Sequence, residues 1–93
     1  MRVGYVYITS NPRRTTFYIG VTNNIVRRMS EHRQRTKGFT SRYQVYQLVY
    51  YERFDSIVVA IRREKQLKKW NRQWKIDLIK SVNPKMLAIE VGY

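Results

Sequence analysis

Residues 3–20 decide the fold, and they read VGYVYITSNPRRTTFYIG. Residues 3–9 and 15–20 are rich in β-branched and aromatic side chains, which favour strands. Between them, residues 10–14 include Ser, Asn and Pro, residue types that are typical of turns. Two strands separated by so short a break predict an antiparallel hairpin at the start of this sequence.

The rest of the chain predicts helices and a further strand. Side chains at 22–24 and 55–56 can cap helices, Asn71 can interrupt a helix, and Asn83 before Pro84 can end one. After the hairpin we expect, in order, a helix over 24–34, a loop over 35–44, a strand over 45–51, a helix over 57–70, a further helix to about residue 81 and a short strand over 86–91. These elements predict one α/β domain over residues 1–93, with a small three-stranded, mainly antiparallel sheet flanked by helices.

The composition excludes several classes of protein. The 93 residues include 43% hydrophobic and 14% aromatic side chains, too many for a disordered basic tail. Cysteine is absent and histidine occurs once, which excludes disulfides, a thiolate zinc site, a cysteine nucleophile and a multi-histidine metal cage. Nineteen Lys and Arg residues against six Asp and Glu give a net charge of +13. A basic, aromatic-bearing, compact domain is typical of proteins that bind nucleic acid.

The sequence contains no recognisable signal for export or membrane insertion. Residues 1–14 have no apolar segment with a small-residue cleavage site, and no stretch approaches the roughly 20 apolar residues of a spanning helix. We therefore expect a cytoplasmic protein. A basic amphipathic helix on an anionic membrane surface is the alternative that the charge allows.

The basic residues gather in two clusters, one on the first predicted helix and its loop and one on the C-terminal helices. Each phosphate that such a cluster neutralises releases counterions, so nucleic-acid binding is expected to depend strongly on salt. A solvated helix face is the alternative, although few acids are present to balance these charges. The residues expected to contact nucleic acid are Arg27, Arg33, Arg35, Lys37, Arg42, Lys65, Lys68, Lys69 and Arg72.

Five polar residues have positions that point to chemistry. Arg28 and His32 are four positions apart and therefore share one face of a predicted helix. Glu64 is an isolated acid in a basic helix, spaced so that its carboxylate points toward the sheet. Tyr7 and Tyr18 lie on the two strands of the predicted hairpin, where their hydroxyls can come close.

Each of these residues also has an ordinary structural interpretation. Strand tyrosines usually pack, a lone histidine is often structural, Arg28 can be a surface charge, and Glu64 can pair with Lys68. Together, however, they supply a carboxylate for a hard cation, an arginine for phosphate charge and groups that transfer protons. That combination fits metal-assisted hydrolysis of a phosphodiester.

The same residues resemble the GIY-YIG endonuclease domain. The second half of the family signature is intact as Tyr18-Ile19-Gly20, whereas Tyr5-Val6-Tyr7 stands in place of Gly-Ile-Tyr and keeps the tyrosine. The most specific segments are YIGVTNNIVRRMSEH at 18–32 and AIRREKQLKKW at 60–70, the second similar to small bacterial members. The resemblance covers about residues 5–84.

The resemblance implies a nuclease with one divalent cation, Mg²⁺ or Mn²⁺, bound by the hard carboxylate of Glu64. It also implies that water attacks phosphorus in line, with Tyr7 as general base or water-positioning group and His32 assisting. Tyr18 would hydrogen-bond near the scissile phosphate, and the planar guanidinium of Arg28 would stabilise the charge of the transition state.

We therefore expect a metal-dependent DNA endonuclease that acts on single-stranded or structured DNA. Aromatic side chains such as Phe39 and Tyr43 could stack on unpaired bases, although core packing explains them equally well. Two alternatives stay open: a nucleic-acid-binding module of the same fold without catalysis, and an RNA-associated basic protein. Asn71 and Asn83 are the candidates for an asparagine that larger family members carry beyond the glutamate.

Overall fold

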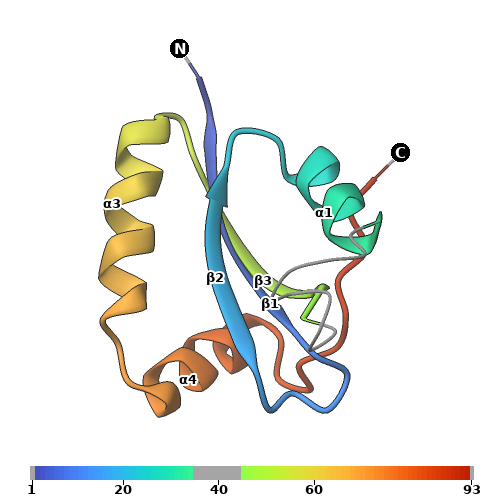
Figure 1. Cartoon of the computed structure of the whole chain (residues 1–93). Coiled ribbons are helices and arrows are strands. Elements are labelled where there is room, and N and C mark those ends of the chain that lie inside the picture. The colour runs from blue at the N-terminus through green and yellow to red at the C-terminus, as the bar shows by residue number, and fades with distance from the viewer. Residues whose placement is uncertain (1, 35–44, 93) are drawn as a thin grey trace.

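The computed structural model describes residues 2–34 and 45–92 of the chain. Its elements are β1 (Gly4–Ser10), β2 (Phe17–Thr22), α1 (Ile25–Gln34), β3 (Gln47–Phe54), α3 (Ile57–Lys68) and α4 (Arg72–Val82). The predicted α/β fold is confirmed: β1 is the central strand of an antiparallel three-stranded sheet in the order β2-β1-β3. Figure 1 shows α3 and α1 on opposite sides of this sheet.

The pleat of β1 sends alternate side chains into two cores. Val6 and Ile8 pack with Ala60 of α3 in an apolar core that also receives α4. Tyr7, between them in the sequence, points to the opposite face and packs with Met29 of α1. The two faces of the sheet therefore differ in chemistry, because a polar aromatic residue replaces the aliphatic ones on the α1 side.

The helix boundaries follow the predicted caps. The Ser56 side chain accepts a hydrogen bond from the Val59 amide at the start of α3. The Asn71 side chain accepts one of 2.9 Å from the Trp74 amide, so the expected break before α4 is confirmed. No helix within the described residues is long and apolar enough to cross a lipid bilayer.

Two strand boundaries differ from the prediction. The Asn11 side-chain oxygen accepts 2.9 Å hydrogen bonds from the amides of Thr15 and Thr16, so these residues belong to the turn and β2 begins at Phe17. The third strand begins at Gln47 and runs to the end of β3, three residues beyond the predicted limit. Local side-chain bonding in the turn and pairing with β1 determine these limits.

The predicted strand over 86–91 is wrong. This segment is joined to β3 by a hydrogen bond of 2.7 Å from the Ile89 amide to the Leu48 carbonyl, but it forms no strand. Arg14, whose φ of 60° is in the left-handed region, donates a 2.7 Å hydrogen bond from Nε to the Met86 carbonyl. A side chain from the distant β1–β2 turn thus helps hold the segment in place of a ladder of backbone bonds.

Candidate active site

Tyr7 lies in a hydrogen-bonded group on the α1 side of the sheet. Its hydroxyl oxygen accepts a hydrogen bond of 3.0 Å from Arg28 Nε and lies 3.2 Å from His32 Nε2, whose role depends on the ring tautomer. Arg28 and His32 reach the same oxygen because they are one helical turn apart on α1. Tyr7 and His32 are both buried. Three of the predicted catalytic side chains therefore meet at one atom.

Tyr18 adds an aromatic wall to this group. Its ring centroid lies 6.2 Å from that of Tyr7 and 5.9 Å from that of His32. Tyr18 is half-buried on β2, which is an edge strand of the sheet. The group is therefore closed by α1 on one side and bordered by the edge strand on the other.

Gly20 makes room for the Tyr7 ring. The two residues are partners in the β1–β2 register. A β-carbon at position 20 would lie 2.5 Å from Tyr7 Cζ, a distance that real β-carbons essentially never reach. The glycine of the signature therefore has a local steric reason: the phenol head lies against its backbone.

Arg28 carries a charge that is held from two sides. Its Nη1 lies 3.3 Å from Glu31 Oε1, and its side chain is 25% exposed. The hydrogen bond to Tyr7 raises the pKa of Arg28, although burial acts in the opposite direction. The guanidinium thus stays charged and partly open to solvent, as binding a phosphate oxygen requires. Sequence reasoning missed Glu31, although its spacing of three from Arg28 was the available signal.

Glu64 lies on α3, whose core-facing side packs on the opposite face of the sheet. Its side chain is 13% exposed, and Oε2 forms an ion pair of 2.9 Å with Lys68 Nζ. Arg63, one residue earlier, is bound to Glu52 of β3. Because successive helical residues are about 100° apart, Glu64 projects from a different side of α3 than Arg63 does. The contacts therefore group four predicted catalytic residues, whereas Glu64 lies on α3, which packs on the other face of the sheet.

A metal site here would depend on few protein ligands. Residues 2–34 and 45–92 contain no cluster of three or more His, Cys, Asp or Glu side chains that could hold a metal ion. One carboxylate nevertheless suits Mg²⁺ or Mn²⁺, which keep several waters and bind substrate phosphates. Glu64 fits that type of site because its carboxylate is sheltered and its partner Lys68, half-exposed, can move aside.

The residues predicted to contact nucleic acid lie on two surfaces. Arg27 and Arg33 are exposed on α1. Around the end of α3 and the start of α4, the exposed basic side chains are Lys65, Lys68, Lys69 and Arg72. The predicted contacts at Arg35, Lys37 and Arg42, and the loop aromatics Phe39 and Tyr43, lie outside the described residues.

The side chains of the two candidate asparagines form hydrogen bonds with the backbone. Asn71 caps α4, as described above. Asn83 donates 2.9 Å hydrogen bonds from Nδ2 to the carbonyls of Val49 and Leu87 and accepts one from the Leu87 amide. Asn83 therefore ties the end of α4 to β3.

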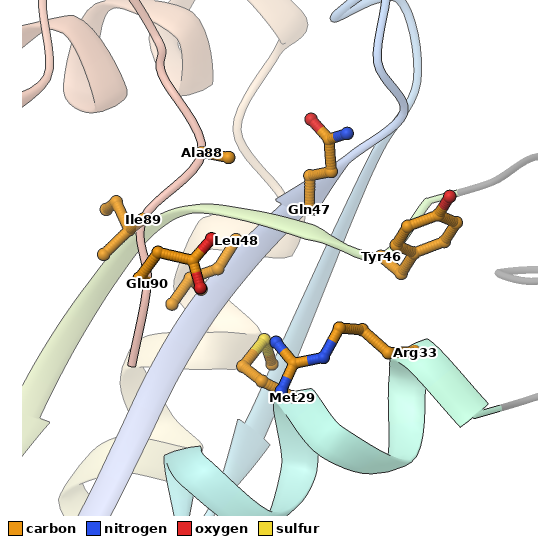
Figure 2. Close-up of a pocket in the computed structure, with 8 residues that line it drawn as sticks. All are labelled: Met29, Arg33, Tyr46, Gln47, Leu48, Ala88, Ile89 and Glu90. Carbon is orange, nitrogen blue, oxygen red and sulfur yellow. The ribbon is translucent and has the colours of Figure 1, made fainter. Parts of the chain in front are cut away.

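A hollow of about 140 Å³ lies between α1, the start of β3 and the C-terminal segment (Figure 2). Arg33 and Glu90 border it with opposite charges. Met29 and Leu48, which also line it, belong to the same core as Tyr7. The described lining includes none of the five predicted catalytic residues, so this hollow is separate from the Tyr7 group.

Sequence reasoning also missed a pair of tryptophans at the junction of α3 and α4. Trp70 and Trp74 meet edge to face, with ring centroids 5.9 Å apart. Their spacing of four residues was a signal, but the predicted break at Asn71 separated them into different helices.

Comparison with known proteins gives one family. The family described as "GIY-YIG catalytic domain" matches residues 3–77. A UPF0213 protein of Syntrophus aciditrophicus (strain SB) is 37% identical over 89 residues, covering 94% of this chain and 100% of the relative. A UPF0213 protein of Natronomonas pharaonis is 38% identical over 80 residues, covering 81% and 88%. The solution NMR structure of a UPF0213 protein from Bacillus halodurans has a TM-score of 0.57 and 26% identity, covering 89% of this chain and 88% of that one.

Proposed function

Because this chain belongs to the GIY-YIG family, we propose that it is a divalent-metal-dependent endonuclease that hydrolyses phosphodiester bonds in DNA. Membership supports a nuclease domain and a nucleic-acid substrate. The net charge of +13 supports a polyanionic substrate independently of the family.

The observation that carries the proposal is the position of the Tyr7 hydroxyl between Arg28 and His32. In hydrolysis a water oxygen forms a bond to phosphorus, one phosphorus–oxygen ester bond breaks, the water loses a proton, and the leaving oxygen gains one to become a hydroxyl. An arginine beside a phenol oxygen stabilises the phenolate, which can accept that proton. His32, with its proton on Nδ1, can hold the proton of Tyr7 at Nε2.

Arg28 has the second role in this scheme. A trigonal-bipyramidal phosphorus carries more negative charge on its oxygens than the ground state does, and a fixed cation lowers the barrier by stabilising it. The bond to Tyr7 uses Nε, and other N–H groups of the partly exposed guanidinium are available to the phosphate. Tyr18 would position the phosphate at the sheet edge.

Glu64 is the residue that would hold Mg²⁺ or Mn²⁺. The bound cation would polarise a phosphate oxygen and lower the pKa of a coordinated water. To hold the cation, the Glu64 carboxylate would have to give up its ion pair with Lys68. Lys68 can then turn to solvent or to a phosphate, because its side chain is already half-exposed.

The same ion pair favours a second candidate, a nucleic-acid-binding module of the same fold without catalysis. A carboxylate neutralised by Lys68 needs no metal. In that case the basic surfaces would bind DNA or RNA, and no cation would produce cleavage.

Cleavage of labelled single-stranded, duplex and flap DNA in Mg²⁺, Mn²⁺ or EDTA tests these candidates. We expect the wild type to cleave DNA with the cations and not in EDTA. Glu64→Ala should not cleave DNA. Arg28→Ala should bind DNA nearly as well as the wild type. Lys85→Ala is the matched control, since it removes one exposed positive charge from the segment after α4. Binding without cleavage in any cation, or full activity of Glu64→Ala, contradicts the metal-dependent nuclease.

A further inference from the structure

We propose that the junction of α3 and α4 is a nucleobase-stacking subsite that binds the unpaired bases of single-stranded DNA. This inference rests on the proposed function, because it names the form of DNA that the nuclease would hold. The subsite is a hollow of about 520 Å³ lined by Arg62, Lys65, Gln66, Lys69, Trp70 and Trp74. We call these six residues the α3–α4 elbow, and Figure 1 shows the turn of the chain from α3 into α4.

Trp74 provides the stacking surface. Its side chain is 55% exposed, an unusual position for the largest apolar side chain. One part of the ring meets Trp70 edge to face at an interplanar angle of 87°. Bases of any sequence can stack on such a ring, because every base has a π-face.

The two rings are held in place before any ligand binds. The Arg63 guanidinium lies 5.3 Å from the Trp70 ring centroid and is itself bound to Glu52 of β3. The side chain of Asn71 accepts a hydrogen bond from the Trp74 amide, which fixes the first turn of α4. A rigid aromatic platform loses little conformational entropy on binding, which favours its use as a ligand surface.

The charge around the rings selects a polyanion. Arg62, Lys65 and Lys69 line the same hollow as the tryptophans. Asp77, three residues beyond Trp74 on α4, accepts a 2.8 Å hydrogen bond from Gln73. An exposed tryptophan surrounded by cations matches a nucleic-acid strand better than an apolar protein partner, whose surface would leave these charges unpaired.

The elbow connects to the Tyr7 group along the edge strand. The Arg72 guanidinium, at the start of α4, lies 5.2 Å from the ring centroid of Phe17. Phe17 begins β2 and precedes Tyr18, and Gly20 follows at about 10 Å along the strand, by the usual rise per residue. A single DNA strand whose bases stack on Trp74 can therefore continue past Arg72 toward Tyr18 on β2. A duplex would present its phosphates here and keep its bases stacked inside.

Tryptophan fluorescence measures this subsite directly, because both tryptophans of the chain lie in the elbow. The experiment titrates the Glu64→Ala variant in EDTA, so that DNA stays intact, with oligothymidylate and with an abasic oligonucleotide of the same length. We expect oligothymidylate to quench the fluorescence and the abasic strand to bind more weakly without quenching. Equal binding and equal signal for the two strands would overturn the stacking.

Variants separate stacking from charge. By anisotropy of a labelled oligothymidylate, Trp74→Ala should weaken binding by roughly 10- to 100-fold, and Trp74→Phe should retain most of it. Trp74→Ala should leave the slope of log K against log salt concentration unchanged. Lys69→Ala should reduce that slope by about one released counterion. Leu87→Ala, which removes another exposed apolar side chain, should change neither. Unchanged affinity of Trp74→Ala contradicts the subsite.

Two further outcomes distinguish this inference from the nuclease proposal. If the wild type binds unpaired thymidines through Trp74 but cuts nothing in any cation, the nuclease proposal fails and the subsite stands. If the wild type cuts and Trp74→Ala has the same KM on single strands, the nuclease stands and the subsite fails. A dimer that sedimentation detects and Trp74→Ala dissociates would reassign the elbow to a protein interface.

Discussion

Arg28 Nε donates a hydrogen bond of 3.0 Å to the hydroxyl oxygen of Tyr7, a residue of the central strand β1. The bond joins α1 to β1 and uses one N–H of a guanidinium that is otherwise partly open to solvent. It fixes the plane of the arginine relative to the phenol, so a phosphate bound by the remaining N–H groups would lie beside a group that can accept a proton.

Replacing Arg28 by Lys tests this geometry. Lysine keeps the charge but cannot bind Tyr7 and a phosphate through a planar fork. We expect kcat to fall by roughly 100-fold or more, as for loss of one transition-state donor, with little change in DNA affinity. Steady-state cleavage kinetics measure kcat, and a filter-binding assay measures the DNA affinity. A variant whose KM rises while its kcat is unchanged places Arg28 in binding alone.

Tyr7→Phe removes the hydroxyl and keeps the buried ring. We expect kcat to fall by roughly 10²- to 10⁴-fold, and the arm of the pH–rate profile that reports the base to disappear. Tyr51→Phe is the matched control, because Tyr51 pairs with Tyr7 in the register of β1 and β3 and is partly exposed. Equal activity of the two variants is incompatible with proton transfer at Tyr7.

Gly20→Ala should destabilise the protein through Tyr7. The added β-carbon would lie 2.5 Å from Tyr7 Cζ, and forcing such an overlap costs about 1–3 kcal/mol. Urea denaturation measures the loss. In a double-mutant cycle the cost should shrink in the Tyr7→Ala background, where the ring is absent. The same cost in both backgrounds means that another neighbour causes it.

Glu52 makes stability depend on pH. Burial raises the pKa of this carboxyl, but hydrogen bonds from Arg63 and Tyr50 outweigh it, so the pKa lies below its ordinary value of 4.5. Burial and the carboxylate raise the pKa of Tyr50, which stays protonated and donates to Glu52. The pKa of Glu52 is lower in the folded state than in the unfolded state. Its contribution to the free energy of unfolding is therefore complete above about pH 4.5 and is lost as the pH falls through the lowered folded-state pKa.

Thermal unfolding from pH 7 to pH 3 checks this dependence. Glu52→Gln should have a lower Tm than the wild type at pH 7, and the gap should narrow toward pH 3. Glu90→Gln, at an exposed position, should run parallel to the wild type. A constant gap for Glu52→Gln across this range means that the carboxylate acts through shape rather than charge.

The Tyr7 group was predictable because its rules are local. Helical spacing alone puts Arg28 and His32 on one face, and pairing of two short strands brings Tyr7 and Tyr18 together. The relation of Glu64 to that group was less predictable. It depends on which flank of α3 faces β2, and that orientation is set by packing and by the bond between Arg63 and Glu52.

Long-range side-chain bonds account for the wrong prediction of a strand over residues 86–91. Residues 86–91 have the composition of a strand, but the contacts of Arg14 and Asn83 hold the segment after α4 in another form. Likewise, a break at Asn71 was predictable from its capping ability, whereas the meeting of Trp70 and Trp74 across that break required the angle between two helices.

The sheet order also has a consequence for synthesis of the protein. Of the strands that the structure describes, β1 is synthesised first and is the central one, and its Gly4 pairs with Phe54 of β3. Until β3 and α3 emerge, Val6 and Ile8 lack the Ala60 side chain of α3 with which they pack in the folded protein. Such pairing distant in sequence slows folding and leaves an apolar strand edge open. Chaperone binding to the ribosome-attached chain should therefore peak before α3 is synthesised.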